Sequence, residues 1–260
     1  MKRAKRCVHC LTELTPPEKS GTAPLDTAAT KDHVFPKQWF PDNTPQNLNR
    51  WTVPACARCN RELGAIEKRL LNTIILCLDV TRHEIAGIYQ RVKKGLAIGL
   101  TEEERKQLGP NELHAREQEK KKLIESIRPL DELDSDAKKS MFPGLGEWQT
   151  PAPQFALTFK EEDIRREAQK MVRGCEYQIA KRYVEPPYTV QVHFVHEGDV
   201  PDGIWKIVEK FADSYDIGPA FRAKRATALD EPLVVFYRID FWGHVVVYAF
   251  IDQEELHGSS

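Results

Sequence analysis

Lys31-Asp32-His33-Val34-Phe35-Pro36-Lys37 lies between two pairs of cysteines, and this arrangement decides how the first part of the chain folds. The two pairs are Cys7-Val8-His9-Cys10 and Cys56-Ala57-Arg58-Cys59. Four thiolates at this spacing can bind one tetrahedral zinc ion, so we predict that segments about fifty residues apart meet at a single point. The loop that contains Asp32 and His33 then returns to the place where it began.

The composition is that of an ordinary protein with a sizeable core. Of the 260 residues, 41% are hydrophobic and 30% are charged, and the length favours two domains. The formal net charge of -1 excludes a globally basic nucleic-acid-binding protein. Residues 1–60 nevertheless carry nine lysines and arginines against five acidic residues, so the first part of the chain is locally basic.

The start of the chain and the use of cysteine indicate a cytoplasmic protein. The first residues are basic without an apolar core region, so they do not resemble a secretory signal, and no run reaches membrane-spanning length. In a reducing compartment, cysteine pairs at this spacing bind zinc more often than they form disulfides. We expect Cys77 and Cys175 to be small core residues. His9 lies between paired cysteines, but four thiolates already complete the zinc shell.

The first half of the chain reads as strands and loops followed by helices. Frequent prolines interrupt residues 1–60 and favour short strands and loops there. Apolar residues recur every three or four positions over residues 61–91, which predicts one helix. Thr101 and Glu104 have the spacing of a capping box, and the charged residues 111–128 predict a solvated helix.

The end of the chain predicts a second region of mixed structure. Residues 161–183 have the apolar stripe of a helix, and a strand at 188–195 and a short helix at 203–215 follow. Residues 233–240 and 243–251 are β-branched and aromatic, which indicates a hairpin in a mostly antiparallel sheet.

The predicted fold class is therefore α+β, with three regions along the chain. Residues 1–92 form a small zinc-stapled domain, and residues 93–159 form a helical spacer and linker. Residues 160–260 form a second α+β domain with an accessory, recognition or regulatory role.

Together the motifs resemble the HNH endonuclease family, also called the ββα-metal nucleases, in the zinc-ribbon form with two cysteine knuckles. The matching elements lie within about residues 5–70 and are Cys7-x-x-Cys10, Asp32-His33-x-x-Pro36, Asn47-Leu48 and Cys56-x-x-Cys59-Asn60. The resemblance implies a ββα-metal nuclease domain in this part of the chain. One departure is that Arg61-Glu62-Leu63-Gly64 stands where the family often has a lysine.

The resemblance also implies a role for each polar residue of the motif. His33 would be the general base that deprotonates the attacking water, since a neutral imidazole can accept a proton at pH 7. Asp32 and Asn60 would bind one divalent cation, Mg²⁺ or Mn²⁺, which stabilises the pentacovalent phosphate and the departing 3′ oxygen. The products would carry a 5′ phosphate. Asn47, or else Asn49, would brace the hairpin through hydrogen bonds to the backbone.

Contacts to nucleic acid are predicted near the first cysteine pair and beside the Asp-His pair. The basic residues that would touch phosphates there are Lys2, Arg3, Lys5, Arg6 and Lys37. A second basic set recurs at helical spacing later in the chain and comprises Arg166, Lys170, Arg173 and Lys181. We expect this second set to form a solvated face. The aromatic residues Phe35, Trp39, Phe40 and Trp51 are expected to fill a small core around the hairpin.

The sequence therefore favours a metal-dependent endonuclease that hydrolyses phosphodiester bonds of nucleic acid. We expect DNA rather than RNA as the substrate, and no membrane partner. On family analogy it would act in phage defence, in restriction or in a mobile element. Its metals would be a structural Zn²⁺ and a catalytic Mg²⁺ or Mn²⁺. A regulatory protein or a second copy of the chain could bind through residues 160–260. The alternative is a non-catalytic zinc-ribbon module that binds nucleic acid or protein within a larger complex.

Overall fold

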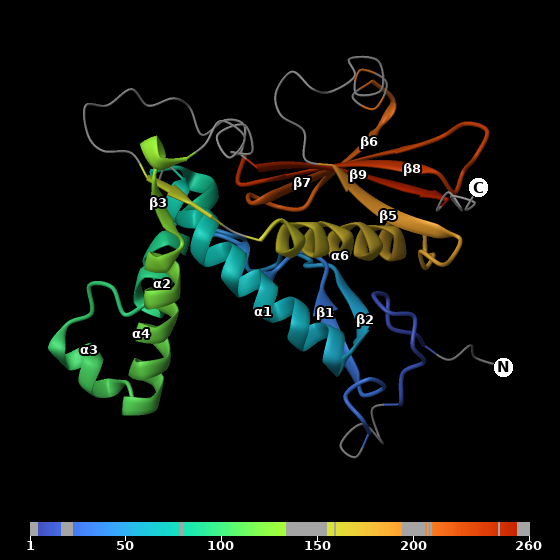
Figure 1. The fold of residues 1–260 in the computed structure, drawn as a ribbon. Helices are drawn as coiled ribbons and strands as arrows, with labels where there is room; N and C mark the ends of the chain where they lie inside the picture. Colours follow the sequence, from blue (N-terminus) through green and yellow to red (C-terminus); the bar gives the residue numbers. More distant parts are fainter. Residues whose placement is uncertain are drawn as a thin grey trace, which may run out of the picture.

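The structure is a computed structural model. It describes residues 5–16, 23–78, 81–133, 155–158, 160–193, 206, 208, 210–243 and 245–253. Figure 1 shows a sheet at one side of the molecule, a long helix, α6, directly beneath it, and a strand hairpin and a second long helix, α1, beneath α6.

The hairpin carries the Asp-His pair. Strand β1 (Ala29–His33) pairs antiparallel with β2 (Thr52–Cys56). Helix α1 (Ala57–Ile74) begins directly after β2, and the Cys56 Sγ accepts a hydrogen bond from the backbone N–H of Cys59 at the start of the helix. The apolar face of α1 is buried because its apolar residues recur at helical spacing. This face comprises Leu63, Ile66, Leu70, Leu71 and Ile74.

The single helix expected over residues 61–91 is wrong beyond Ile74. A 3-10 turn (Ile75–Cys77), a second one (His83–Ile85) and helix α2 (Ile88–Gly95) follow α1 separately. The chain turns at Gly87, which has φ +77° and lies against Asp42, where a Cβ would be 1.8 Å from the carboxylate oxygen Oδ2. Apolar periodicity continues across this turn, so the sequence pattern alone did not reveal the interruption.

Helices α2, α3 (Glu102–Gln107) and α4 (Pro110–Glu125) lie beside one another on the side away from β5 (Figure 1). The predicted capping box is confirmed, since Thr101 and Glu104 exchange both of its hydrogen bonds. Helix α4 has no buried residue, as expected for a solvated helix. Strands β3 (Ile127–Pro129) and β4 (Phe155–Leu157) then pair antiparallel, and most of the predicted linker lies outside the described residues.

The sheet has five antiparallel strands in the order β5-β9-β8-β7-β6. The strands are β5 (Tyr188–His193), β6 (Asp213–Asp216), β7 (Phe221–Thr227), β8 (Val235–Phe241) and β9 (Val245–Gln253). The predicted β8–β9 hairpin and the α+β class with an antiparallel sheet are confirmed. Residues 213–215 lie in β6, so the helix expected over 203–215 is wrong at its end, and most of its remainder lies outside the described residues.

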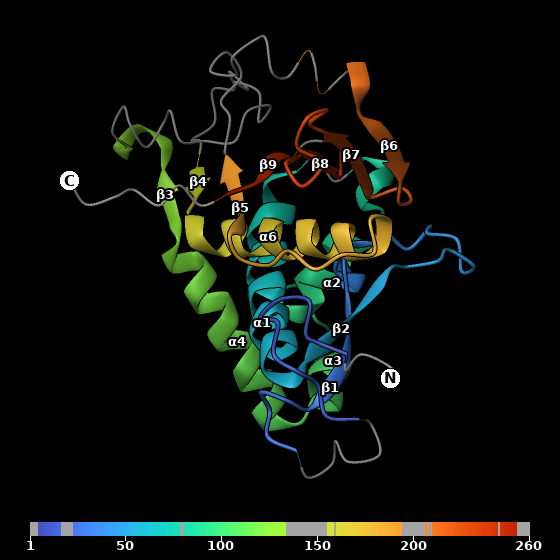
Figure 2. The same ribbon diagram turned by 90° about the vertical axis from the view of Figure 1, so that its right-hand side faces the viewer.

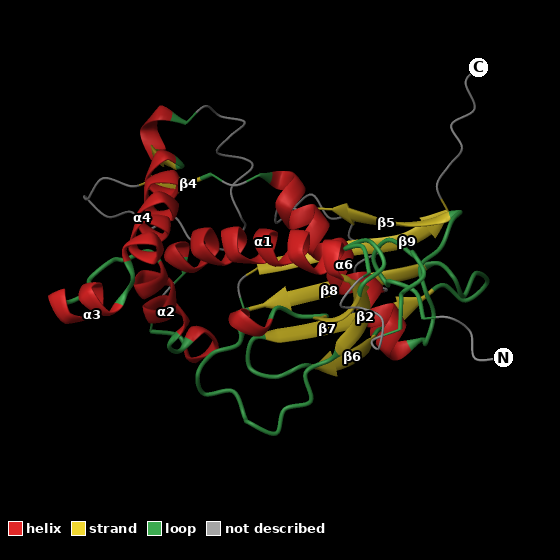
Figure 3. Ribbon diagram, turned by 90° about the horizontal axis from the view of Figure 1, so that it is seen from below, coloured by secondary structure: helices red, strands yellow, loops and turns green. Residues whose placement is uncertain are grey.

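Helix α6 (Glu161–Ile179) lies between the sheet and the hairpin, as Figure 2 shows, and Figure 3 shows from below that it crosses one face of the sheet. Gln169 Nε2 donates a hydrogen bond of 3.0 Å to the backbone oxygen of Val190 in β5. Gln178 Nε2 donates one of 2.6 Å to the backbone oxygen of Thr52 in β2. Gly174 packs closely against Val34. A Cβ at position 174 would lie only 2.7 Å from Val34 Cγ1, so a larger residue would not fit there. The helix is therefore bonded to the sheet on one side and packed on the hairpin on the other.

A buried carboxylate strengthens the attachment of α6 to the sheet. Glu176 accepts hydrogen bonds from Tyr237 Oη at 2.5 Å and from Arg225 Nε at 2.7 Å. Arg182 donates a further hydrogen bond to it. Burial alone would raise the pKa of Glu176, but these donors outweigh it and lower the pKa below its ordinary value.

One hydrophobic core contains residues from both ends of the chain. Trp39, in a 3-10 turn (Lys37–Trp39) after β1, packs on Phe241 and Trp242 with ring centroids 5.4 Å and 4.9 Å away. Phe35 packs on Phe221 at 4.8 Å. The hairpin aromatics expected in a small local core therefore belong to a core shared with the sheet. The boundaries drawn after residues 92 and 159 stay predictions.

Candidate functional site

The four cysteines of the two pairs lie together, as the sequence predicts. The Sγ atoms of Cys7, Cys10, Cys56 and Cys59 are all within 4.8 Å of one another, and those of Cys10 and Cys56 are 3.8 Å apart. The first pair is held against the second because the backbone N–H of Val8 donates to the backbone oxygen of Pro54 in β2. None of the four forms a disulfide.

The spacing of the four sulfur atoms fits a tetrahedral metal ion such as zinc. Zn–S bonds of about 2.3 Å place tetrahedral sulfur ligands about 3.8 Å apart. A hydrogen bond from Cys59 is the main cause that lowers the pKa of Cys7, which favours the thiolate form that binds a metal. The four residues can therefore hold a structural zinc.

Asp32 and His33 lie at the end of β1, where neighbouring side chains point to opposite faces. Asp32 shares its face with Thr30, whose Oγ1 accepts a hydrogen bond of 3.2 Å from Asn60 Nδ2. Asn60 lies in the first turn of α1, and its Nδ2 also lies 3.4 Å from the backbone oxygen of Lys31. Both amide hydrogens are thus directed at β1, and the Asn60 Oδ1 accepts no hydrogen bond from a described residue.

Asp32 is only 4% exposed and has two charged or polar neighbours. Its Oδ2 lies 2.9 Å from Nε2 of His9, and its Oδ1 lies 4.0 Å from Nζ of Lys170 on α6. Burial alone would raise the pKa of Asp32, but the hydrogen bond from His9 and the charge of Lys170 lower it below the ordinary value. Asp32 is therefore ionised at neutral pH.

Lys170 is the centre of a cluster of ionisable groups, which we call the Lys170 cluster and which comprises Asp32, Glu67, Glu167 and Lys170. The Lys170 side chain is 0% exposed, and its Nζ lies 2.5 Å from Glu67 Oε1 and 3.2 Å from Glu167 Oε1. Burial raises the pKa of Glu167 to about 8, so this carboxyl holds its proton at neutral pH. The expectation that Lys170 belongs to a solvated face is wrong, because α6 turns this residue toward α1 and the hairpin.

Residue spacing could have indicated part of this cluster. Glu67 follows Asn60 by seven positions on α1, which places both on one face of the helix, and Glu167 precedes Lys170 by three positions on α6. Each pair is visible in the sequence, but the approach of α6 to α1 is not. The contact of His9 with Asp32 is not visible in the sequence, because it depends on the fold of the first cysteine pair.

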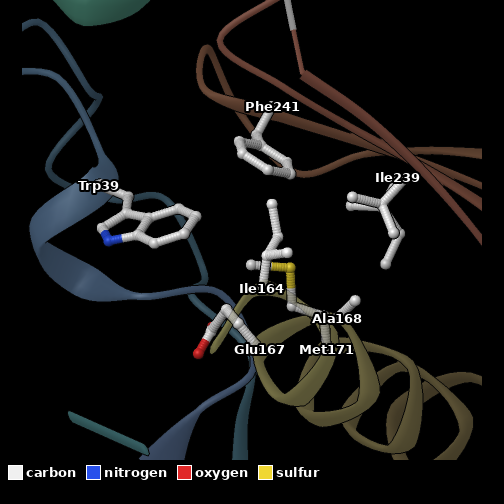
Figure 4. A pocket seen from close by; sticks show the side chains of 8 residues that line it. Trp39, Ile164, Glu167, Ala168, Met171, Ile239 and Phe241 are labelled. Atoms are coloured by element: carbon white, nitrogen blue, oxygen red, sulfur yellow. The ribbon is translucent and has the colours of Figure 1, made fainter. Parts of the chain in front are cut away.

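A small cavity lies beside Glu167, between α6, the sheet and Trp39. Figure 4 shows the Glu167 carboxyl at the margin of a lining that is otherwise apolar, with Trp39 on one side and Ile239 on the other. The cavity volume is about 10 Å³, which admits at most one water molecule. It is therefore too small to bind a substrate or an organic cofactor.

His33 is partly buried at the end of β1, and its Nδ1 is buried with no hydrogen-bond partner among the described residues. Burial is the main cause that lowers the pKa of His33. Asp32 opposes this shift, while Lys170, Arg50 and Lys37 lower the pKa further by their positive charge. The imidazole is therefore neutral at pH 7 and can accept a proton.

Neither candidate for the asparagine that would brace the hairpin forms the expected hydrogen bonds. Asn47 and Asn49 are both exposed in the β1–β2 connection, and neither forms a hydrogen bond to another described residue. Arg91 holds part of this connection instead, since its Nη2 donates hydrogen bonds to the backbone oxygens of Gln38 and Phe40. The role assigned to Asn47 stays a prediction.

The residues predicted to touch nucleic acid differ in their surroundings. Lys5 and Lys37 are exposed. Arg6 forms an ion pair with Glu185 and lies over the ring of Tyr183, 4.5 Å from its centroid. Lys2 and Arg3 lie outside the described residues.

Comparison of the chain with protein-family models, with curated proteins and with solved structures found no match. Among the helices in the described part of the chain, none has both the length and the apolar character that crossing a membrane requires.

Proposed function

We propose that this protein is a metal-dependent endonuclease of the HNH type. The observation that carries the proposal is the place of Asn60, whose amide is fixed over β1 on the face that carries Asp32, with His33 next to Asp32 at the end of the strand. The order of the elements is strand, strand and helix, as in the family that the sequence resembles, and the cysteine cluster joins a segment that precedes β1 to the end of β2 and the start of α1. Three residue types required for this chemistry therefore come from one small unit.

Asp32 and Asn60 would hold the catalytic cation through their remaining oxygens. Asp32 Oδ1 lies 4.0 Å from Lys170 Nζ, beyond hydrogen-bond distance, and Asn60 directs its Nδ2 at the strand and leaves its Oδ1 available. One carboxylate and one amide oxygen suit Mg²⁺ or Mn²⁺, which completes its shell with water and substrate phosphate. When bound, the cation would neutralise charge on the phosphate and on the departing 3′ oxygen.

His33 would supply the base. Its neutral imidazole takes a proton from a water molecule, and the oxygen of that water bonds to phosphorus as the bond to the 3′ oxygen breaks. The 3′ oxygen takes up a proton, and the phosphate stays on the 5′ end of the other product. The low pKa of His33 supports this role because the base must be neutral before each cleavage.

Exposed lysines near the site would bind the backbone of the substrate. Lys37 follows β1 closely, and its ammonium group is close enough to lower the pKa of His33. Such contacts attract phosphates of any sequence and position the nucleic acid without reading its bases. DNA is the proposed substrate, and specificity would come from the remainder of the chain.

A second candidate function is a non-catalytic zinc module that binds nucleic acid or protein. The burial of Asp32 favours this candidate, because a carboxylate that binds a cation together with substrate must be reached by both. We also propose that the protein acts in phage defence, in restriction or in a mobile element, and that it is cytoplasmic. A regulatory partner or a second copy of the chain would bind through residues 160–260.

A cleavage assay separates the two candidates. Zinc-loaded protein is incubated with supercoiled plasmid or with RNA, in Mg²⁺, in Mn²⁺ or in EDTA. The proposal predicts cleavage of DNA that EDTA abolishes and that Asp32→Asn also abolishes. The exposed Asp230 provides a control, since Asp230→Asn should cleave like the wild type. Binding of DNA without cleavage in either metal would support the non-catalytic module.

A further inference from the structure

The contact between His9 and Asp32 is not explained by the zinc site or by the proposed catalytic roles. His9 lies between the two cysteines of the first pair, and its side chain is 6% exposed. Its Nε2 lies 2.9 Å from Asp32 Oδ2, which is the distance of a charge-assisted hydrogen bond. An imidazole buried at this distance from a carboxylate fixes the orientation of that carboxylate. Its hydrogen bond also offsets part of the free energy that is lost when the carboxylate is removed from water.

The backbone of His9 is bound by a residue of α6. Arg173 Nη1 donates a hydrogen bond of 3.1 Å to the backbone oxygen of His9. The neighbouring Cys7 and Cys10 fix the backbone on both sides of His9 when they bind a metal. The position of the imidazole is therefore set by two elements distant in sequence, the first cysteine pair and α6.

Lys170 borders the other oxygen of Asp32. Its ammonium lies 4.0 Å from Oδ1, beyond hydrogen-bond distance, and is held closer to Glu67 and Glu167. Asp32 Oδ2 is thus bonded to His9, while its Oδ1 forms no hydrogen bond with Lys170. Free rotation of the carboxylate would exchange these oxygens, and the bond to His9 prevents it.

We infer that His9 is a positioning residue for Asp32. It fixes one carboxylate oxygen so that the other can bind the catalytic cation, and the first cysteine pair therefore orients the site as well as stabilising the hairpin. The inference rests on the proposed function because it takes Asp32 as a ligand of that cation. Residues that support a metal ligand in this way typically change metal affinity or activity by about 10-fold to 100-fold when they are replaced.

The test uses the zinc-loaded full chain and measures two quantities, the Mn²⁺ dissociation constant by electron paramagnetic resonance and the kcat and KM of DNA cleavage. His9→Phe keeps a ring but removes the donor, and we expect Mn²⁺ affinity and kcat each to fall about 10-fold or more while KM for DNA changes little. His9→Gln keeps an N–H donor and should recover most of both. His83→Phe replaces an exposed histidine and should resemble the wild type.

Zinc content and the unfolding midpoint are measured for each variant, and His9→Asn replaces His9→Phe if the latter does not fold. Wild-type Mn²⁺ affinity and kcat in a folded His9 variant that lacks the bond would overturn the inference. If the wild type binds Mn²⁺ but does not cut DNA, the proposed function fails. In that case, loss of Mn²⁺ binding in both Asp32→Asn and His9→Phe still supports the inference. Absence of Asp32-dependent Mn²⁺ binding in the wild type would overturn it.

Discussion

The indole Nε1 of Trp242 donates a hydrogen bond of 2.9 Å to the backbone oxygen of Trp39. Trp39 follows the Asp-His pair by a few residues, whereas Trp242 lies in the turn between β8 and β9. The two rings also pack on each other. The end of the chain therefore fixes the segment that leaves the candidate site.

Replacement of Trp242 should destabilise the whole chain. Both tryptophans are fully buried, so Trp242→Ala removes a large ring from the core and leaves the Trp39 carbonyl without its donor. We expect the free energy of unfolding to fall by about 3–5 kcal/mol in denaturant titrations. Leu229→Ala, at a side chain that is 99% exposed, should change it by less than about 0.5 kcal/mol. Equal effects of the two substitutions would contradict the shared core.

Removal of zinc should unfold the hairpin region first. Structural zinc contributes on the order of 10 kcal/mol to the folding of a small site. Cys59→Ser should lose the metal and the amide-exchange protection of β1 and β2, while Cys77→Ser should keep both because Cys77 is not in the cluster. Metal analysis and hydrogen exchange measure this, and full protection of the hairpin in Cys59→Ser would show that the metal is not its staple.

The rate of cleavage should depend on pH through His33. The base acts in its neutral form, and its pKa is lowered below 6.5, so activity should persist below pH 6.5 and fall only as the pH drops through the lower value. Arg50 is one of the charges that lower this pKa, so Arg50→Gln should move the acidic limb of kcat/KM to higher pH. Arg222→Gln, at an exposed position, should leave the limb in place. A limb unchanged in Arg50→Gln would argue against His33 as the titrating group.

Two basic residues predicted to touch phosphates should behave differently. Lys37 is exposed, so Lys37→Ala should weaken DNA binding and lower the slope of log affinity against log salt by about one. Arg6 is already paired with Glu185 and Tyr183, so Arg6→Ala should alter the slope much less. Fluorescence anisotropy over a range of salt concentrations measures both slopes. A larger change for Arg6→Ala than for Lys37→Ala would contradict this assignment.

The sequence predicted those features that depend on a few residues close together in the chain. Cysteine spacing predicted the cluster, and the Thr101–Glu104 pair predicted a helix start, because metal ligation and capping each depend on a few residues. Strand β7 was missed because it buries Phe221 with the small residues Ala223 and Ala226, while arginines and lysine fill most positions between them. Small buried residues such as alanine contribute little to the alternation of apolar and polar residues by which a strand is predicted.

The surroundings of the candidate site depend on contacts that no local pattern encodes. Asp32, His33 and Asn60 could be named from the sequence as candidates. The burial of Asp32 by His9 and Lys170 could not, because it requires α6 to pack on a hairpin more than a hundred residues earlier in the chain. A lysine among polar neighbours on a helix is usually solvated, and here three carboxyl groups surround it instead.

The role of His33 as the general base is tested by the rate at which zinc-loaded protein nicks supercoiled plasmid in saturating Mn²⁺, compared between the wild type and His33→Ala. We expect the nicking rate to fall by about 10²-fold to 10⁴-fold in His33→Ala, with unchanged zinc content and unfolding midpoint. Nicking at the wild-type rate in a folded His33→Ala variant would contradict this role.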